Sequence, residues 1–300
     1  MISGVINVYK EKGMTSHDVI WHLRHILQQK KIGHTGTLDP DAEGVLPVCL
    51  GMGTRLCDYL QQGEKVYQAG LLLGVTTDTQ DISGTVLQRQ EVEVSADRLT
   101  ECVSGFAGPQ LQLPPMYSAL KVGGKKLCDL ARKGIEVERK ERKIIIHSIR
   151  VERIDLPRAV ITVTCSRGTY IRTLCEDIGR ALGCGGCMES LVRLQVGSFK
   201  AEDALRLEEI RQLQEKRALE AHILPVDHFF PEAGKAAVLP DCDRQLHNGN
   251  AFRQEKLILQ ENHCWTKTLR VFDSEGHFVG IFEKDESSSL YRPKTIFWQQ

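Results

Sequence analysis

Asp39 is the residue whose setting in this sequence best suits it for chemistry. It lies within Gly33–Pro47 (GHTGTLDPDAEGVLP), a stretch rich in glycine and threonine that turns at Leu38-Asp39-Pro40 before an apolar run. Proline disfavours the α region for the residue before it, so Asp39 is expected on extended backbone, and flanking glycines let other groups approach closely. The loop therefore suits a positioned carboxylate. An Asp-Pro pair also commonly starts a plain turn, and these three residues alone do not decide between the two interpretations.

Taken whole, Gly33–Pro47 resembles the GHTGxLDPxAxGxL motif of the TruB-type tRNA pseudouridine synthases, which carries that family's single essential aspartate. Further blocks resemble the family in the same order: GVINVYKEKGMTS at Gly4–Ser16, then TDTQDISG, PPMYSALKVGGKKL, CSRGTYIRTL, GCGG and HNGN. The resemblance covers nearly the whole chain. Within the family it is closest to the bacterial type, which modifies uridine 55 in the T arm of tRNA without a guide RNA.

The resemblance implies an α+β fold in two parts. A pseudouridine-synthase catalytic domain is expected at residues 1–230, built on a mixed, mainly antiparallel sheet with flanking helices and an RNA-clamping insertion at about 114–143. A small all-β, PUA-like RNA-binding domain is expected at 236–300, although an accessory domain without RNA contact stays open. The composition agrees, because prolines punctuate the chain near residue 230 and short β-like runs follow: AAVLP, KLILQ, TLRVFD, HFVGIFEK and KTIFWQQ.

Apolar periodicity predicts the elements that would hold the candidate site. A helix capped at Thr15 and Ser16 should run to Lys30 and Lys31 and stop before Gly33, so that the Asp39 loop begins where this helix ends. The other predicted elements are a strand at Lys65–Val75 that forms a hairpin with ISGTVLQ, a helix at Ser95–Phe106, a strand at Ala159–Cys165 and a helix at Thr169–Leu182.

Arg172 falls in the first turn of the last of these helices. The helix dipole penalises a cation there by about 0.3–1 kcal/mol, so the position favours a nearby anion. Asp39 could be that anion, and a surface carboxylate could serve equally well. In the TruB family the arginine of the GTYIR block pairs with the catalytic aspartate, so the resemblance makes Arg172 the second catalytic candidate.

The resemblance also assigns five further residues to the site. A tyrosine in an apolar strand is usually a core residue, but Tyr67 matches the family tyrosine that contacts the uracil and is proposed to act in proton transfer at C5. Tyr170 matches another pocket tyrosine, and Leu191 matches the leucine that packs on the flipped base. His34 would stack within the remodelled RNA loop, and Lys10 matches a lysine that supports the site. His34, Tyr170, Leu191 and Lys10 are thus expected to bind substrate.

The chain departs from the family pattern at three positions near these motifs. Glu11 stands where a proline usually follows the lysine, Cys128 where the insertion commonly has tyrosine, and Val192 where an arginine often follows the leucine. None of them replaces a catalytic candidate, so activity is expected to survive.

Charge is balanced over the chain, with 39 basic and 39 acidic residues, so nucleic-acid binding must come from local patches. Residues 116–143 hold nine basic and four acidic residues. Phosphate binding and a solvated charged loop explain this patch equally well, and the resemblance favours the first. No apolar run is long enough to cross a bilayer and the start is charged too soon for a secretory signal, so a cytoplasmic protein without membrane contact is expected.

The ten cysteines do not form a recognisable zinc motif. Cys184 and Cys187 make one CxxC, and no second pair or nearby HxxxH completes four ligands. Neither a Walker loop nor a Rossmann fingerprint occurs. Isomerisation of uridine involves no net redox change, so no metal or other cofactor is expected. A thiol or zinc protein remains a distant alternative.

The sequence thus predicts a monomeric tRNA pseudouridine synthase that flips its target base, with an RNA-binding or tRNA-folding chaperone, in which catalysis is secondary, as the alternative. The motifs do not distinguish attack of Asp39 at C1′, attack at C6 or a glycal route.

Overall fold

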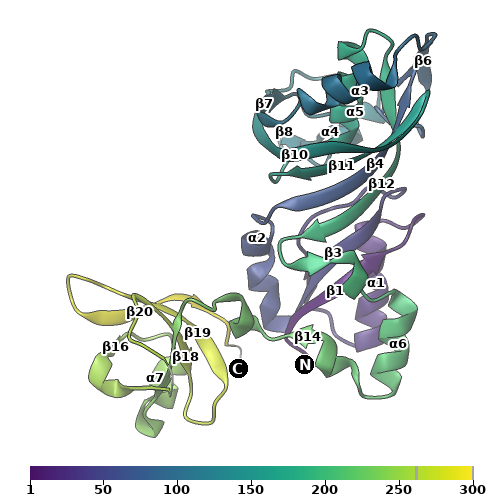
Figure 1. Cartoon of the computed structure of the whole chain (residues 1–300). Helices are drawn as coiled ribbons and strands as arrows, with labels where there is room; N and C mark the ends of the chain where they lie inside the picture. The colour runs from purple at the N-terminus through teal and green to yellow at the C-terminus, as the bar shows by residue number, and fades with distance from the viewer. Residues whose placement is uncertain (261–262, 299–300) are drawn as a thin grey trace.

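Two large β-sheets organise the computed structural model, which describes residues 1–260 and 263–298 (Figure 1). The first sheet is formed by strands β1 (Gly4–Lys10), β2 (Ile32–His34), β3 (Glu43–Leu50), β4 (Lys65–Leu73), β7 (Gly108–Gln112), β10 (Arg142–Asp155), β11 (Arg158–Cys165), β12 (Gly186–Val196), β13 (Phe199–Lys200) and β14 (Ile223–Leu224). Its order is β14-β1-β3-β12-β4-β11-β10-β7, with β2 attached to β3 and β13 to β12. Two small hairpins, β5 (Val75–Thr77) with β6 (Val86–Arg89) and β8 (Lys121–Val122) with β9 (Lys125–Lys126), lie outside it.

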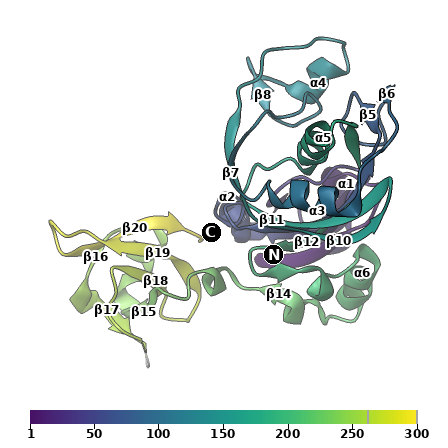
Figure 2. The same cartoon turned by 45° about the horizontal axis from the view of Figure 1, so that its top comes forward.

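The helices cover this sheet in two groups. They are α1 (Ser16–Leu27), α2 (Cys57–Leu60), α3 (Ala96–Ser104), α4 (Leu127–Ala131), α5 (Ile171–Ala181) and α6 (Leu207–Glu215). Helices α1 and α6 pack with β1 and β3, whereas α3 and α5 pack with β4, β10, β11 and β12, so the sheet supports two separate apolar cores. Short 3₁₀ turns occupy Gly51–Leu56, Ala201–Asp203, Leu219–His222, Val226–Phe229, Pro240–Cys242 and Gln254–Lys256. Figure 2 shows α4 and β8 standing away from the sheet near α5.

The two halves of the first sheet meet at β3 and β12, which pair in parallel, while the other neighbours along the described order are antiparallel. This confirms the expected mixed, mainly antiparallel sheet. At the seam Gly44 lies opposite Arg193. Gly44 has φ +108°, and a Cβ built there would lie 2.2 Å from the Arg193 carbonyl oxygen. Glycine is therefore required at the end of the Asp39 loop for the halves to join.

Helix α1 begins where the sequence predicted and ends earlier. Thr15 caps it in a capping box with Asp18, which confirms the predicted start. The predicted end was wrong, because Gln28 adopts φ +50° in the left-handed region and stops the helix at Leu27. Lys30 and Lys31 consequently lie in the connection to β2.

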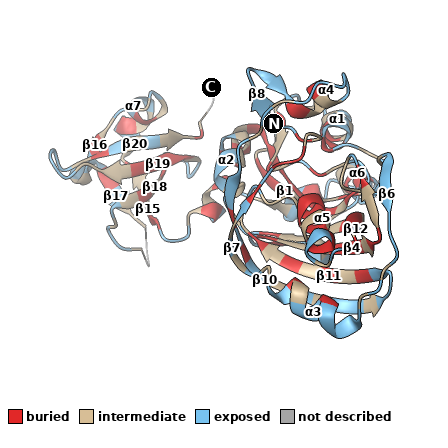
Figure 3. Ribbon diagram, turned by 90° about the horizontal axis from the view of Figure 1, so that it is seen from above, coloured by how far each residue is buried: buried red, intermediate tan, exposed pale blue. Residues whose placement is uncertain are grey.

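The hairpin predicted around TTDTQD exists with different strands. The first predicted strand ends at Leu73, and Gly74 with φ +81° separates it from β5. Strand β5 pairs with β6, whereas β4 lies between β11 and β12 in the central sheet. The expectation that Lys65–Val75 itself forms the hairpin was therefore wrong. Strand β6 is exposed throughout (Figure 3). The predicted helices at 95–106 and 169–182 and the strand at 159–165 are confirmed as α3, α5 and β11.

The second sheet confirms a small all-β, PUA-like C-terminal part. Its strands are β15 (Gly234–Val238), β16 (Phe252–Arg253), β17 (Leu257–Leu259), β18 (Thr268–Phe272), β19 (Phe278–Lys284) and β20 (Leu290–Ile296), in the order β16-β20-β19-β18-β15-β17, with helix α7 (Asp243–His247) beside them. Strand β15 begins two residues before the expected boundary at 236. The last two residues of the KTIFWQQ run lie outside the described residues.

An apolar cluster connects the second sheet to the first. Ile281 of β19 and Phe297, which follows β20, pack with Val5 and Val45 of the first sheet and with Phe229 of the connecting segment. No helix in the described part of the chain is long and apolar enough to cross a membrane.

The seam leads to the first prediction. Gly44→Ala should lower the free energy of unfolding by about 2 kcal/mol or more, because it adds strain at positive φ to a clash with the β12 backbone. Urea denaturation followed by circular dichroism measures the change. Gly197→Ala is the matched control, since Gly197 also has positive φ but open space around its Cα, and should cost only about 1 kcal/mol. Equal losses in the two variants would contradict the role given to the seam.

Candidate active site

Two side chains anchor the loop that carries Asp39, one on each side of it. Before Asp39, the Leu38 amide donates to Ser16 Oγ at 2.9 Å, at the buried start of α1. After it, Lys10 Nζ donates to the carbonyl oxygens of Pro40 at 3.1 Å and Ala42 at 2.5 Å. The backbone around Asp39 is therefore fixed by β1 and by the first turn of α1, and not by the loop alone.

Lys10 has no exposed surface, so it lies beneath the loop. Burial lowers the pKa of its ammonium to about 8, against the opposite effect of the Asp39 carboxylate nearby. Lys10 Nζ donates a third hydrogen bond to the carbonyl oxygen of Glu11 at 3.1 Å. Lys10 was expected to bind substrate; its surroundings suit a residue that positions the loop. Glu11, which stands where the family usually has proline, does not prevent this geometry.

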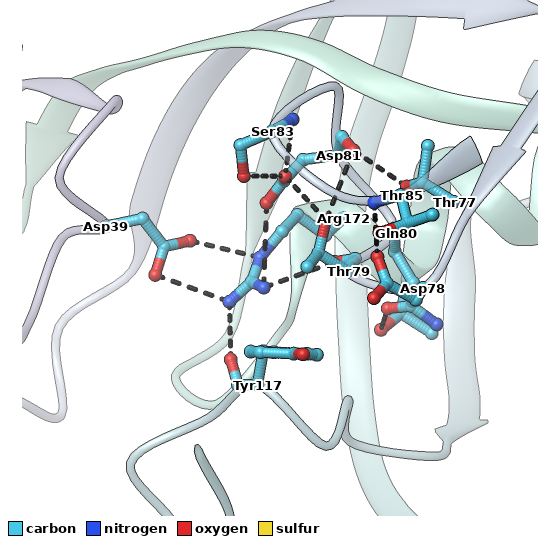
Figure 4. A network of polar contacts seen from close by, with 11 residues as sticks. Asp39, Thr77, Asp78, Thr79, Gln80, Asp81, Ser83, Thr85, Tyr117 and Arg172 are labelled. Atoms are coloured by element: carbon cyan, nitrogen blue, oxygen red, sulfur yellow. Dashed lines mark hydrogen bonds and ion pairs between the residues drawn. The ribbon is translucent and has the colours of Figure 1, made fainter. Parts of the chain in front are cut away.

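Asp39 and Arg172 lie side by side at the cavity wall and form a bidentate ion pair (Figure 4). Arg172 Nε lies 3.0 Å from Asp39 Oδ2, and Nη2 donates to Oδ1 at 3.3 Å. The Arg172 side chain is 7% exposed, whereas that of Asp39 is 40% exposed. The cation is thus held inside the protein, and the carboxylate remains accessible from the cavity.

Arg172 is held in place by three further acceptors. Its guanidinium donates to the carbonyl of Tyr117 at 2.9 Å and to that of Thr79 at 3.3 Å, and Nη1 lies 3.7 Å from Asp81 Oδ2. The Asp81 carboxylate is itself fixed by Ser83, whose amide and hydroxyl donate to Oδ1 at 3.0 and 2.5 Å. The arginine is therefore anchored by groups other than Asp39.

Asp81 was not identified from the sequence as a site residue. It lies in the TDTQDISG block that resembled the family, so an acidic residue inside a matched block was the available signal. What the sequence did not reveal is that this turn packs against the start of α5, where the Thr173 hydroxyl donates to Gln80 Oε1 at 2.8 Å.

The surroundings of Asp39 favour the protonated form of its carboxyl more than water would. Burial raises the pKa of its carboxyl above the ordinary value of 3.8, Arg172 opposes this, and the negative charge of Asp81 adds to it. Arg172 thus serves to keep a partly buried carboxylate ionised at neutral pH.

Aromatic and apolar side chains form the wall of the cavity beside Asp39. In the β4–β12 pairing Tyr67 lies opposite Arg193 and Ala69 opposite Leu191, so these side chains share one face. Tyr170, just before α5, exchanges two hydrogen bonds through its backbone with the buried Gln112 side chain, at 3.0 and 2.8 Å. That bond pair fixes the start of the helix that carries Arg172.

The cavity has a volume of about 690 Å³ and brings together most of the predicted residues. Six of the seven line it: His34, Asp39, Tyr67, Tyr170, Arg172 and Leu191. A second hollow of about 860 Å³, which includes Lys126 and Arg132 of the insertion, shares Asp39 and Arg172 with the first. Asp39 therefore lies where the two hollows meet.

His34 and the tyrosines are suited to stay neutral. Burial and the nearby Arg193 lower the pKa of His34, whose Nδ1 accepts the Gly36 amide at 3.3 Å. Burial raises the pKa of both Tyr67 and Tyr170. Flat uncharged rings in a cavity of this size suit a planar ligand such as a nucleobase.

Cys184 and Cys187 are both buried, and burial raises the pKa of the Cys187 thiol to about 11. Within the described residues no group of three or more His, Cys, Asp or Glu is arranged to hold a metal ion. These thiols thus behave as small apolar residues next to α5.

Comparison with known proteins agrees with this geometry. A family model described as TruB family pseudouridylate synthase (N terminal domain) matches residues 24–171, and one described as tRNA pseudouridylate synthase B C-terminal domain matches residues 172–230. A relative named tRNA pseudouridine synthase B from Lachnoclostridium phytofermentans is 48% identical, with 99% of this chain and 100% of the relative covered. The chain belongs to the TruB family.

Other TruB relatives and solved structures extend the comparison. A tRNA pseudouridine synthase B from Clostridium perfringens is 42% identical over 95% of this chain and 96% of its own length. A structure described as a Cbf5-Nop10-Gar1 complex matches with a TM-score of 0.70 and 25% identity, covering 98% of this chain and 85% of that one. An H/ACA RNP bound to a substrate RNA matches in fold at 23% identity and a TM-score of 0.69, covering 99% and 85%. The fold shared with these structures thus extends over both sheets.

From the charges around Asp39 we predict opposite shifts in the pKa of its carboxyl for two variants. Arg172→Gln should raise the pKa of the Asp39 carboxyl further, because it removes the cation that opposes burial. Asp81→Asn should lower it, because it removes a neighbouring negative charge. An NMR titration of protein labelled with ¹³C at aspartate carboxyls measures both shifts. A shift of the same sign in both variants would contradict this electrostatic account.

Proposed function

We propose that this protein isomerises uridine to pseudouridine at position 55 in the T loop of tRNA, with Asp39 as the essential carboxylate. Family membership and the 48% identical tRNA pseudouridine synthase B support the activity. The observation that carries the role of Asp39 is its bidentate pair with a buried arginine at the edge of a nucleotide-sized cavity. The family uses a single essential aspartate in the matching motif.

The reaction breaks the N1–C1′ bond of uridine and joins C1′ to C5. The proton on C5 is lost and N1 gains one, so atoms and electrons balance without a redox partner. Asp39 acts as the nucleophile, or as the base that starts glycosidic cleavage. Arg172 keeps it ionised and aims its oxygens into the cavity through two charge-assisted hydrogen bonds.

The target base must leave the RNA stack to reach Asp39, and the cavity wall replaces its neighbours. Tyr67 contacts the uracil and takes part in proton transfer at C5, while Leu191 and Tyr170 pack on the flipped nucleotide. His34, neutral at the mouth of the Asp39 loop, stacks within the opened T loop. Lys10 contributes by holding the loop from below.

Beyond the target base, basic side chains of the protein would bind the phosphates of the RNA. The described residues that line the cavity around Asp39 include six cations, Lys65, Arg142, Lys143, Arg167, Arg172 and Arg193, and a single acid, Asp39 itself. The insertion at 114–143 adds the exposed lysines of the β8–β9 hairpin. An excess of positive charge on this side suits the phosphates of the T stem.

We further propose that residues 1–230 form the catalytic domain and residues 236–300 an RNA-binding domain. The protein works as a monomer in the cytoplasm on tRNA alone, without a guide RNA, a membrane or a cofactor. The bacterial relatives that match over nearly their whole length carry the name of a tRNA enzyme, which supports the stand-alone assignment.

The direct test is a product map with Asp39→Asn. Wild-type protein incubated with unmodified tRNA transcripts should form pseudouridine at position 55, read as reverse-transcription stops after carbodiimide treatment. Asp39→Asn should form none and still bind the transcript, since its shape is kept while the negative charge is lost. Asp41→Asn, which removes an exposed carboxylate two residues away, should retain activity.

Each other outcome has a definite meaning. Product from Asp39→Asn at the wild-type rate would overturn the role of Asp39. Modification at another position would overturn the T-loop assignment. tRNA binding and refolding by wild-type protein, without product at any site, would favour the chaperone alternative.

The insertion gives a separate prediction on affinity. The double variant Lys125→Ala/Lys126→Ala should weaken tRNA binding and reduce the slope of log K against log salt by about 2, because two phosphate contacts are lost. Filter binding at several salt concentrations measures the slope. Lys216→Ala, at the end of α6 away from the insertion (Figure 1), should leave the slope unchanged. An unchanged slope in the double variant would remove the insertion from the RNA contact.

A further inference from the structure

Arg193 is a buried cation without a carboxylate partner. Its side chain is among the largest that are fully buried, with the residue 2% exposed. None of the ion pairs among the described residues involves Arg193, and the one acid that lines the cavity, Asp39, pairs with Arg172. A buried charge is costly unless it is paired or used. Lys10 and Lys65, also buried, add to the positive charge around it.

Backbone oxygens hold the Arg193 guanidinium at the junction of three segments. Nε donates to the carbonyl of Val45 in β3 at 2.7 Å, and Nη2 donates to the carbonyl of Gly36 in the Asp39 loop at 3.3 Å. Nη1 lies on the Gly36 side, 3.8 Å from the position a Cβ of that glycine would take. These two bonds use two of the five donors of a guanidinium.

The remaining side of Arg193 faces the cavity next to Tyr67. The two residues are direct cross-strand neighbours in β12 and β4 and line the same cavity as Asp39. The charge of Arg193 and its hydrogen bonding to the phenol lower the pKa of Tyr67, against the burial that raises it. Arg193 is thus a fixed positive charge beside the phenol oxygen.

We propose that Arg193 is a positioning residue for Tyr67: its guanidinium holds the phenol oxygen in the cavity and supplies the positive charge that lets the phenolate accept the C5 proton. This inference rests on the proposed function. Tyr67, neutral at rest, first releases its proton to solvent, and the charge of Arg193 stabilises the phenolate. The C5–H bond then breaks, its electron pair returns to the ring, and the phenolate becomes phenol. Solvent supplies the proton that N1 gains. The counter-charge of the buried Arg193 is the phenolate that forms on Tyr67, which explains why Arg193 has no carboxylate partner.

A kinetic isotope effect separates this role from a structural one. The substrate is a T-arm hairpin with uridine or 5-deuterio-uridine at the target position, assayed under single turnover. Arg193→Gln keeps a hydrogen-bond donor and removes the charge. It should slow product formation by about tenfold or more and increase the isotope effect over that of wild type, because deprotonation at C5 becomes limiting. A slower rate with no increase in the isotope effect would overturn the proposal.

A double-mutant cycle with Tyr67→Phe tests whether Arg193 acts through the phenol. In the Tyr67→Phe background Arg193→Gln should change the rate by less than about twofold, because the group it serves is gone. Equal fold-losses in both backgrounds would overturn the proposal. Hairpin binding and thermal unfolding are measured for every variant.

Arg193→Lys keeps the inference testable if Arg193→Gln does not fold. Arg193→Lys retains the charge, so it should form product at least about tenfold faster than a folded Arg193→Gln variant. If Arg193→Gln is unfolded, Arg193→Lys should still show the wild-type isotope effect. A folded Arg193→Lys with a raised isotope effect would overturn the role of the charge. Absence of product from wild-type protein would instead refute the proposed function, so the two failures are distinguishable.

Discussion

The ion pair between Asp39 and Arg172 is the interaction on which the rest of the site depends. It joins a loop of one half of the first sheet to a helix of the other half, and its two partners are anchored independently. Lys10 holds the Asp39 loop through backbone carbonyls, and Asp81 with two carbonyl oxygens holds the guanidinium. The pair is therefore preorganised, and the carboxylate keeps its exposed side for a ligand.

The parallel seam between β3 and β12 makes this arrangement possible. It brings the Asp39 loop next to the strand that carries Leu191 and Arg193, and Gly44 permits the close approach of the two backbones. Lys10, Lys65 and Arg193 are buried near this seam, and among the described residues none of them forms an ion pair with a carboxylate. Positive charge buried beside the cavity favours an anionic ligand such as RNA.

Motifs in the sequence predicted the fold class, and the candidates they singled out, Asp39 and Arg172 among them, lie together around one cavity. Each motif sets local backbone conformation and side-chain type. Contacts between distant segments were not predictable in this way. Asp81 and Arg193 become site residues through the β5–β6 turn and the β4–β12 register, which no local pattern encodes. Lys10 lies under the loop because β1 pairs with β3, and α1 ends early because Gln28 turns left-handed.

A structure of the protein bound to a T-arm hairpin with 5-fluorouridine at the target position tests the central claim most directly. The account predicts that the target nucleotide lies in the cavity, with a reacting carbon about 3–3.5 Å from an Asp39 carboxylate oxygen and Arg172 still paired to that carboxylate. A target base that remains stacked in the RNA, or an Asp39 that has left Arg172 and points away from the nucleotide, would contradict it.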